Sequence, residues 1–172
     1  DGRVSVRYRI HENVDKVSDI KHPLIRECLL HFGITEGVEV VVISEVPARG
    51  SGLGASSALA CALCLAASRF SGHMVESKEE IAKIASMIEI GKVGSPIGKQ
   101  DHYASACGGM NMIKFYQGGD VSVNPYGLKD GDFIKELENQ SMLFYLDIEH
   151  EYHGNGFVQK ILRDQVAQVD EK

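Results

Sequence analysis

The sequence predicts a mixed α/β or α+β domain, because strand-like and helix-like segments alternate along its 172 residues. Residues 38–46 form an apolar, β-branched run typical of a strand, and the segment from Ser56 or Ser57 to Phe70 has the character of a buried helix. Residues 110–116 and 121–123 have the pattern of a β-hairpin across a Gly-Gly turn. The length indicates one domain, or one large domain and a fragment of another.

The other elements follow from periodicity and from residues that cap helices. Residues 3–10 alternate like a half-buried or edge strand. Residues 22–32 have helical spacing and end at Gly33, a suitable C′ residue. Ser77 and Glu80 form a capping-box pattern, which predicts a helix to about residue 90. The remaining expected elements are a loop over 91–99, helical turns over 100–106 and 133–137, a strand over 142–148 and a helix over 156–169.

Composition excludes several classes of function. The net charge of −6 argues against a nucleic-acid-binding protein that depends on phosphate contacts, although it leaves room for a nucleotide. Cys61 and Cys64 form a C-x-x-C pair inside a predicted helix, with no second pair and no histidine at zinc spacing. We therefore expect buried, reduced thiols and a cytoplasmic protein. The longest apolar run is too short to cross a membrane, so we expect no membrane partner.

A glycine-rich stretch, Pro-Ala-Arg-Gly-Ser-Gly-Leu-Gly-Ala-Ser-Ser-Ala over residues 47–58, joins the predicted strand to the buried helix. Its three glycines allow a tight backbone that approaches a ligand closely. The first N–H groups of the following helix lack partners inside the helix, and the helix dipole places positive charge there. Together these features predict a phosphate-binding cradle. Ser56 and Ser57 can cap the helix, bind phosphate oxygens or ligate a metal.

Rival glycine-rich motifs fit this stretch less well. A P-loop is rejected, because the nearest candidate, residues 94–99, has the wrong spacing and is followed by Gln100. A dinucleotide fingerprint is met by Gly50, Gly52 and Ala55, but a second helical segment follows where a strand ending in an acid is required. A plain strand-to-helix turn needs fewer special residues than this stretch contains.

Two carboxylates complete the predicted chemistry. Taken singly, Glu89 fits a boundary residue and Asp101 fits a helix N-cap. Transfer of a γ-phosphoryl group to a hydroxyl needs an anion cradle, a Mg²⁺ ion with a carboxylate ligand, and a group that orients or deprotonates the hydroxyl. Ser56 and Glu89 can supply the metal ligands and Asp101 the third part, with Lys99 near enough to neutralise charge. We expect His102, next to Asp101, to contact substrate or to pack.

Residues 47–58 resemble the second motif of the GHMP kinases (galactokinase, homoserine kinase, mevalonate kinase and phosphomevalonate kinase), and residues 89–101 resemble their acidic segment. Residues 98–103 and 108–111 are most similar to heptose 7-phosphate kinase and fucokinase-like sugar kinases. This resemblance extends from about Val4 to Gln165. It implies an α+β fold of the ribosomal protein S5 domain 2 type, in which helices cover one side of a sheet.

The resemblance also implies a site for ATP and Mg²⁺ and an acceptor that is a sugar or a sugar phosphate. Ser56 and Glu89 would hold Mg²⁺, and Asp101, beside Lys99, would act as the base. Ala55 stands where the family has serine, which leaves the choice between Ser56 and Ser57 open, although alignment favours Ser56. The residues expected to wrap the triphosphate are Gly50, Ser51, Gly52, Leu53, Gly54, Ala55, Ser56 and Ser57.

Family members are about twice as long as this chain, and the family's first and third motifs are absent from it. We expect residues 1–140 to be an N-terminal, ATP-binding domain without its first segment, and residues 141–172 to begin a C-terminal domain. Such an incomplete domain should bind ATP weakly or not at all in isolation, and tight Mg·ATP binding by isothermal titration would contradict this. The sequence is compatible with a homodimer.

Two alternatives stay open. A dinucleotide-binding oxidoreductase predicts a parallel sheet with the glycine-rich stretch after its first strand. A non-catalytic fragment would keep the fold without the activity. The kinase interpretation instead predicts that Asp101 lies within several ångströms of the helix entrance at Ser56. His150 and His153 are interpreted as members of a solvated loop rather than a metal site.

Overall fold

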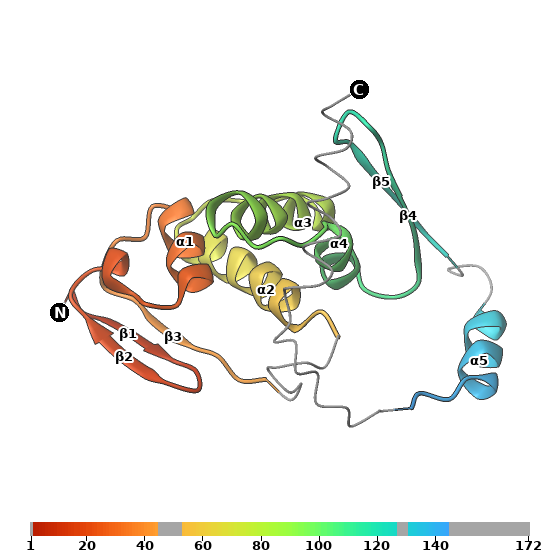
Figure 1. Ribbon diagram of the computed structural model, residues 1–172, viewed down its shortest axis with the longest axis horizontal. Helices are drawn as coiled ribbons and strands as arrows, with labels where there is room; N and C mark the ends of the chain where they lie inside the picture. The colour runs from red at the N-terminus through yellow and green to blue at the C-terminus, as the bar shows by residue number, and fades with distance from the viewer. Residues whose placement is uncertain (1, 45–52, 127–130, 145–172) are drawn as a thin grey trace.

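The computed structural model describes residues 2–44, 53–126 and 131–144. A small sheet lies at one end, helices α1 to α4 gather on one side of it, and a hairpin and a last helix lie at the other end (Figure 1). The strands are β1 (Val4–Arg7), β2 (His11–Val14), β3 (Glu39–Val41), β4 (Asn111–Phe115) and β5 (Val121–Pro125). The helices are α1 (Pro23–His31), α2 (Ala55–Phe70), α3 (Lys78–Ser86), α4 (Gln100–Cys107) and α5 (Gly131–Gln140), with a 3-10 turn η1 (Val17–Asp19) and a π-helical turn η2 (Met87–Lys92).

The N-terminal sheet has the strand order β2-β1-β3. β1 pairs antiparallel with β2 and parallel with β3, so the sheet is mixed. The strand predicted over residues 3–10 therefore ends early, at Arg7, and the chain turns back into β2, which the polar sequence of residues 11–14 did not reveal. The parallel sheet expected of an oxidoreductase is absent from the described residues, where α2 follows β3 and leads to α3 rather than to a strand.

α2 lies at the centre of the core, in contact with α1, α3 and α4. Small side chains on its buried face, among them Ala60, Cys64 and Ala67, let these helices approach closely. From the other elements, Val6 of β1, Ile25 and Cys28 of α1, and Ile88 of η2 complete the same cluster.

The thiols behave as the sequence predicts. Cys28, Cys61 and Cys64 are buried, Cys107 is partly exposed, and all four are free. Burial, together with nearby Cys64 and Glu89, raises the pKa of Cys61 to about 12, so this thiol stays protonated and unreactive at neutral pH. Among the described residues, no helix is both long and apolar enough to span a bilayer.

The helix boundaries agree with several predicted caps. Gly33 follows α1 with a φ of 71°, a left-handed conformation that suits a C′ glycine. Ser77 Oγ accepts a hydrogen bond from the N–H of Glu80 at 3.0 Å, while the Glu80 carboxylate accepts from the N–H of Glu76 rather than from that of Ser77. The helix predicted to extend to residue 90 is α-helical only to Ser86. It continues directly as the π-helical turn η2, which contains Glu89.

The last described part of the chain differs most from the prediction. The β4–β5 hairpin is present, closed by a hydrogen bond from Tyr116 N–H to Asp120 C=O at 3.0 Å. α5 is longer than the predicted turn over 133–137. Residues 142–144 form no strand, and the rest of the predicted strand, His150, His153 and the predicted helix over 156–169 lie outside the described residues.

Candidate active site

The entrance of α2 presents backbone amides that the helix itself leaves unpaired. Gly54 occupies the N-cap position with a φ of 67°, and no side chain caps the helix. The first helical hydrogen bond runs from Ala58 N–H to Gly54 C=O at 2.9 Å, so the amides of the three preceding residues point out of the helix start. Ser56 is exposed there, whereas Ser57 is only 1% exposed. This arrangement can accept an anion.

The remaining residues predicted to wrap a phosphate chain divide into two groups. Gly50, Ser51 and Gly52 lie outside the described residues. Leu53 is exposed just before the helix, and Ala55 is its first residue. The described half of the predicted cradle is therefore the helix start, with its free amides and its exposed serine.

Asp101 lies against this helix entrance. A Cβ atom built on Gly54 would be 3.5 Å from Asp101 Oδ2 and 3.5 Å from Asp101 Cβ. The Asp101 side chain is exposed, and its carboxylate makes no hydrogen bond within the described part of the chain. The carboxylate is thus free to accept a hydrogen bond from a ligand at the start of α2.

The segment between the two predicted acids is folded back on itself. Ser95 N–H donates to Glu89 C=O at 2.9 Å, and Ile97 N–H donates to Ser95 C=O at 2.9 Å. Gly94 adopts a left-handed φ of 77°, which favours glycine at this bend. These local bonds turn the chain between η2 and α4.

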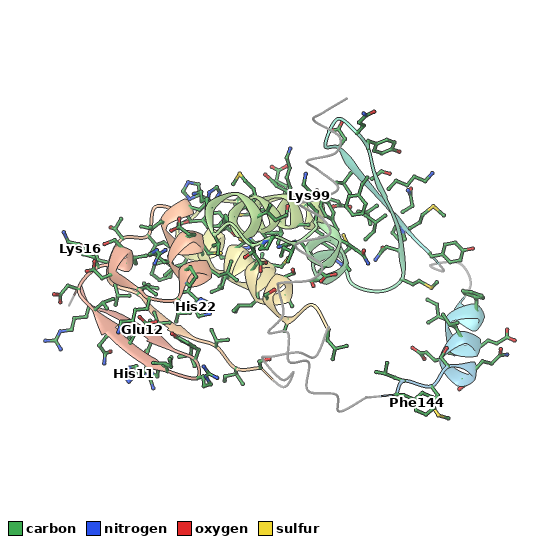
Figure 2. All side chains as sticks on the ribbon, viewed as in Figure 1. His11, Glu12, Lys16, His22, Lys99 and Phe144 are labelled. Atoms are coloured by element: carbon green, nitrogen blue, oxygen red, sulfur yellow. The ribbon has the colours of Figure 1, made fainter. Side chains whose placement is uncertain are left out.

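Lys99 precedes α4 at the N-cap position and is exposed. In Figure 2 it is labelled beside α3 and α4, while Glu12 and His22 are labelled near the N-terminal sheet and the start of α1. Lys99 forms no ion pair with Asp101 in the described structure. Its predicted role as a neutralising charge stays a prediction.

Glu89 is a buried carboxylate, only 4% exposed, on the π-helical turn η2. Its Oε2 atom lies 2.8 Å from Nε2 of His102, which is itself 0% exposed. In the tautomer that carries its proton on Nε2, His102 donates this hydrogen bond to the carboxylate oxygen. The other carboxylate oxygen, Oε1, makes no hydrogen bond with any described residue.

His102 is the site residue whose role the sequence did not reveal. Its Nδ1 atom is buried without a hydrogen-bond partner in the described structure. Its backbone C=O accepts a hydrogen bond from Cys61 Sγ at 3.4 Å, which links α4 to α2. The sequence shows His102 next to Asp101, but a partner 13 positions earlier becomes visible only once η2 and α4 are packed together.

These residues form one continuous arrangement across three elements. Asp101 contacts the start of α2, and the next residue, His102, holds Glu89 of η2. No hydrogen bond joins Glu89 to Ser56 in the described structure. The arrangement therefore places Asp101 against the start of α2, and links Glu89 to α4 through His102.

The Oε1 atom of Glu89 and the exposed hydroxyl of Ser56 are oxygen donors of the kind that suits a magnesium ion bound together with a nucleotide. A carboxylate oxygen without a partner and a serine hydroxyl are hard oxygen ligands of the kind that Mg²⁺ takes. No group of three or more His, Cys, Asp or Glu in the described chain is arranged to hold a metal ion on its own. Mg²⁺ commonly binds through one or two carboxylates plus substrate phosphates, so a sparse protein donor set suits it.

The apolar grooves of the described surface lie elsewhere. One, of about 370 Å³, runs between β3 and α2, and a second, of about 400 Å³, lies beside α2 and the start of α3. Neither is lined by Glu89 or Asp101. Asp101 therefore lies at a helix start and Glu89 at a buried contact with His102, both outside these two grooves.

Comparison with known proteins identifies the family. Residues 20–109, just over half of the chain, match the N-terminal domain of the GHMP kinases. The chain belongs to the GHMP kinase family. The matched range includes the start of α2, Glu89, Asp101 and His102, and the predicted resemblance and α+β fold are confirmed.

Two relatives are sugar-phosphate kinases by name. The chain is 38% identical over 108 residues to the D-glycero-alpha-D-manno-heptose 7-phosphate kinase of Campylobacter jejuni, a match that covers 63% of this chain and 31% of that enzyme. It is also similar to the crystal structure of a D-glycero-D-manno-heptose 1-phosphate kinase from Bacteroides thetaiotaomicron, with a TM-score of 0.68 and 25% identity over 78% of this chain and 47% of that one. The chain thus spans about a third and about half of their lengths.

Proposed function

We propose that this chain is the nucleotide-binding part of an ATP-dependent kinase that phosphorylates a hydroxyl group of a sugar or sugar phosphate. The observation that carries the proposal is the position of Asp101, whose carboxylate lies 3.5 Å from a Cβ built on Gly54 at the start of α2. A helix start binds a phosphate chain, and a free carboxylate beside it can serve the hydroxyl that attacks that chain. The names of the two relatives favour a heptose phosphate as the acceptor.

In this proposal the start of α2 binds the triphosphate of ATP. The amides of residues 55–57 donate to phosphate oxygens, together with residues 50–54 of the glycine-rich stretch. Backbone donors suit this chain, because they bind a polyanion without requiring a basic surface, and the net charge of the chain is −6.

Glu89 and Ser56 would hold Mg²⁺, which neutralises phosphate charge when it is bound. Glu89 contributes its free Oε1 atom, while Oε2 stays bonded to His102. The exposed side chain of Ser56 favours it over the buried Ser57 as the second ligand. Both ligands then come from elements that pack against α2 or begin it.

Asp101 would orient the acceptor hydroxyl and take its proton as the oxygen bonds to the γ-phosphorus and ADP leaves. Its carboxylate is exposed and has no hydrogen-bond partner in the described structure, so it is available to a substrate. Lys99, exposed in the preceding turn, would add positive charge near the transferred group. Residues 1–140 would form the N-terminal domain and residues 141–172 the start of the next.

Exchanging Asp101 for Asn in the full-length protein tests the proposal. A general base contributes about 10²–10⁴-fold to the rate, so turnover should fall by that factor while ATP binding stays nearly unchanged. ADP release in a coupled assay measures turnover against a panel of sugars and sugar phosphates, and titration calorimetry measures nucleotide binding. Undiminished turnover of the Asp101→Asn variant would contradict the role of Asp101.

A further inference from the structure

We propose that His102 is a positioning residue, which holds the Glu89 carboxylate so that Oε1 faces the bound cation. The inference rests on the proposed function, in which Glu89 ligates Mg²⁺. It goes beyond that function because it assigns to a third side chain the task of fixing the distance between the metal ligand and the base.

The contact between the two side chains is direct and shielded from water. His102 Nε2 and Glu89 Oε2 are 2.8 Å apart, and the two side chains are 0% and 5% exposed. A glutamate side chain has several rotatable bonds, and a hydrogen bond to one oxygen fixes which way the other oxygen points. His102 is the side chain that supplies this restraint, because no other described residue bonds the Glu89 carboxylate.

The same helix turn positions both acids. Asp101 and His102 are adjacent in α4, and consecutive residues of an α-helix point about 100° apart. Asp101 is accordingly exposed against the start of α2, while His102 is buried against η2. α4 therefore controls the position of the base through residue 101 and the position of the metal ligand through residue 102.

The two ring nitrogens make the role testable, because only one of them is used. Nε2 donates to Glu89, whereas Nδ1 is buried without a partner in the described structure. The side-chain nitrogen of glutamine lies as many bonds from Cα as histidine Nε2, and that of asparagine as many as Nδ1. His102→Gln can thus keep the hydrogen bond to Glu89, and His102→Asn cannot reach it.

The test measures Mn²⁺ binding by electron paramagnetic resonance, with ADP present, in the full-length protein. Loss of a residue that orients a metal ligand typically weakens metal binding about 10- to 100-fold, so we expect His102→Asn to bind Mn²⁺ at least about tenfold more weakly. His102→Gln should restore binding to near the wild-type value. Equal binding by wild type and His102→Asn, or an equal loss in both variants, would overturn the inference.

Two further measurements separate this inference from the proposed function and from misfolding. Glu89→Gln should also weaken Mn²⁺ binding, and if it does not, the metal assignment itself fails, whatever His102 does. In wild-type protein, ¹⁵N NMR of the imidazole should show a protonated Nε2 and an unprotonated Nδ1, with the Nε2 signal shifted in Glu89→Gln. A proton on Nδ1 alone would overturn the inference without any substitution at His102.

Discussion

Two buried glutamates, Glu12 and Glu89, differ in how completely their carboxylate oxygens are hydrogen-bonded. Glu12 is 6% exposed, and both of its oxygens are bonded: Oε1 accepts from the Tyr8 hydroxyl at 2.9 Å and Oε2 from Lys21 N–H at 2.7 Å. Glu89 is 4% exposed, yet it has a single partner among the described residues, His102, which itself leaves one nitrogen unpaired. Burying a polar group without partners is unfavourable, so the unpaired Nδ1 of His102 and the single hydrogen bond to the Glu89 carboxylate set this site apart from that of Glu12.

The Glu12 cluster has a structural role. Tyr8 and Glu12 belong to the β1–β2 hairpin, and Lys21 precedes α1. The ring of Tyr8 meets the ring of His22 edge-on at 4.9 Å, and His22 Nδ1 accepts a hydrogen bond from Ile25 N–H at 3.5 Å. These bonds fasten the hairpin to the start of α1. Both oxygens of Glu12 are used in this way, so hydrogen bonds within the protein already satisfy its carboxylate.

The largest difference should appear in catalysis. In the full-length protein, Glu89→Gln should lower kcat/KM about 100-fold or more, because it removes a charge that holds the metal. Glu12→Gln is the matched control, since it makes the same chemical change at an equally buried site and should leave kcat/KM near the wild-type value. An equal loss of kcat/KM in both variants would contradict the different roles assigned to the two carboxylates.

The free energy of unfolding should show the reverse order, with the larger loss in Glu12→Gln. Glu12→Gln replaces the charged acceptor of the hydrogen bonds from Tyr8 and Lys21 with a neutral amide, which should lower the free energy of unfolding by about 1–3 kcal/mol. In Glu89→Gln the amide oxygen can still accept from His102, so the change should stay below about 1 kcal/mol. Urea unfolding followed by circular dichroism measures both. A larger loss in Glu89→Gln than in Glu12→Gln would contradict the assignment of structural and functional roles.

The pH dependence of stability sharpens the comparison further. Burial raises the pKa of Glu12, but the hydrogen bonds from Lys21 N–H, the Tyr8 hydroxyl and His22 N–H outweigh it, so the pKa of Glu12 lies below its ordinary value. A lowered native pKa means that the stabilisation is complete above the ordinary glutamate pKa of about 4.3 and is lost as pH falls through the native value. Wild-type melting temperature should therefore drop in acid more steeply than that of Glu12→Gln. If the melting temperatures of wild type and Glu12→Gln fell in parallel with decreasing pH, the hydrogen bonds to Glu12 would not have this stabilising role.

The sequence predicts those parts of the molecule whose structure depends on local patterns. The apolar run before Phe70, the Ser77 cap and the Gly-Gly turn predict α2, the start of α3 and the β4–β5 hairpin, because each depends on neighbouring residues. β2 escaped prediction, since His-Glu-Asn-Val has no apolar alternation and becomes a strand only by pairing with β1. The widening of α3 into η2 was also missed, because a single π-helical turn is too short to leave its own periodicity in the sequence.

The candidate site also has features that the sequence predicts and features that only the packing of its elements determines. The helix start of α2 and the two acids were visible as residue types at a suitable spacing. The bond between Glu89 and His102 was not, because it joins two elements whose packing the sequence pattern does not specify. A histidine next to an aspartate on a short helix fits a packing residue equally well. Only the geometry shows that His102 is turned inward, away from Asp101, toward the second acid.

The most direct test is a crystal structure of the full-length protein with Mg²⁺ and a non-hydrolysable ATP analogue. Our account predicts the triphosphate on the amides at the start of α2, with Glu89 Oε1 at about 2.0–2.1 Å from the cation. Asp101 should face the γ-phosphate across from Gly54. A nucleotide bound away from this helix start, or a cation whose ligands exclude Glu89, would contradict the account.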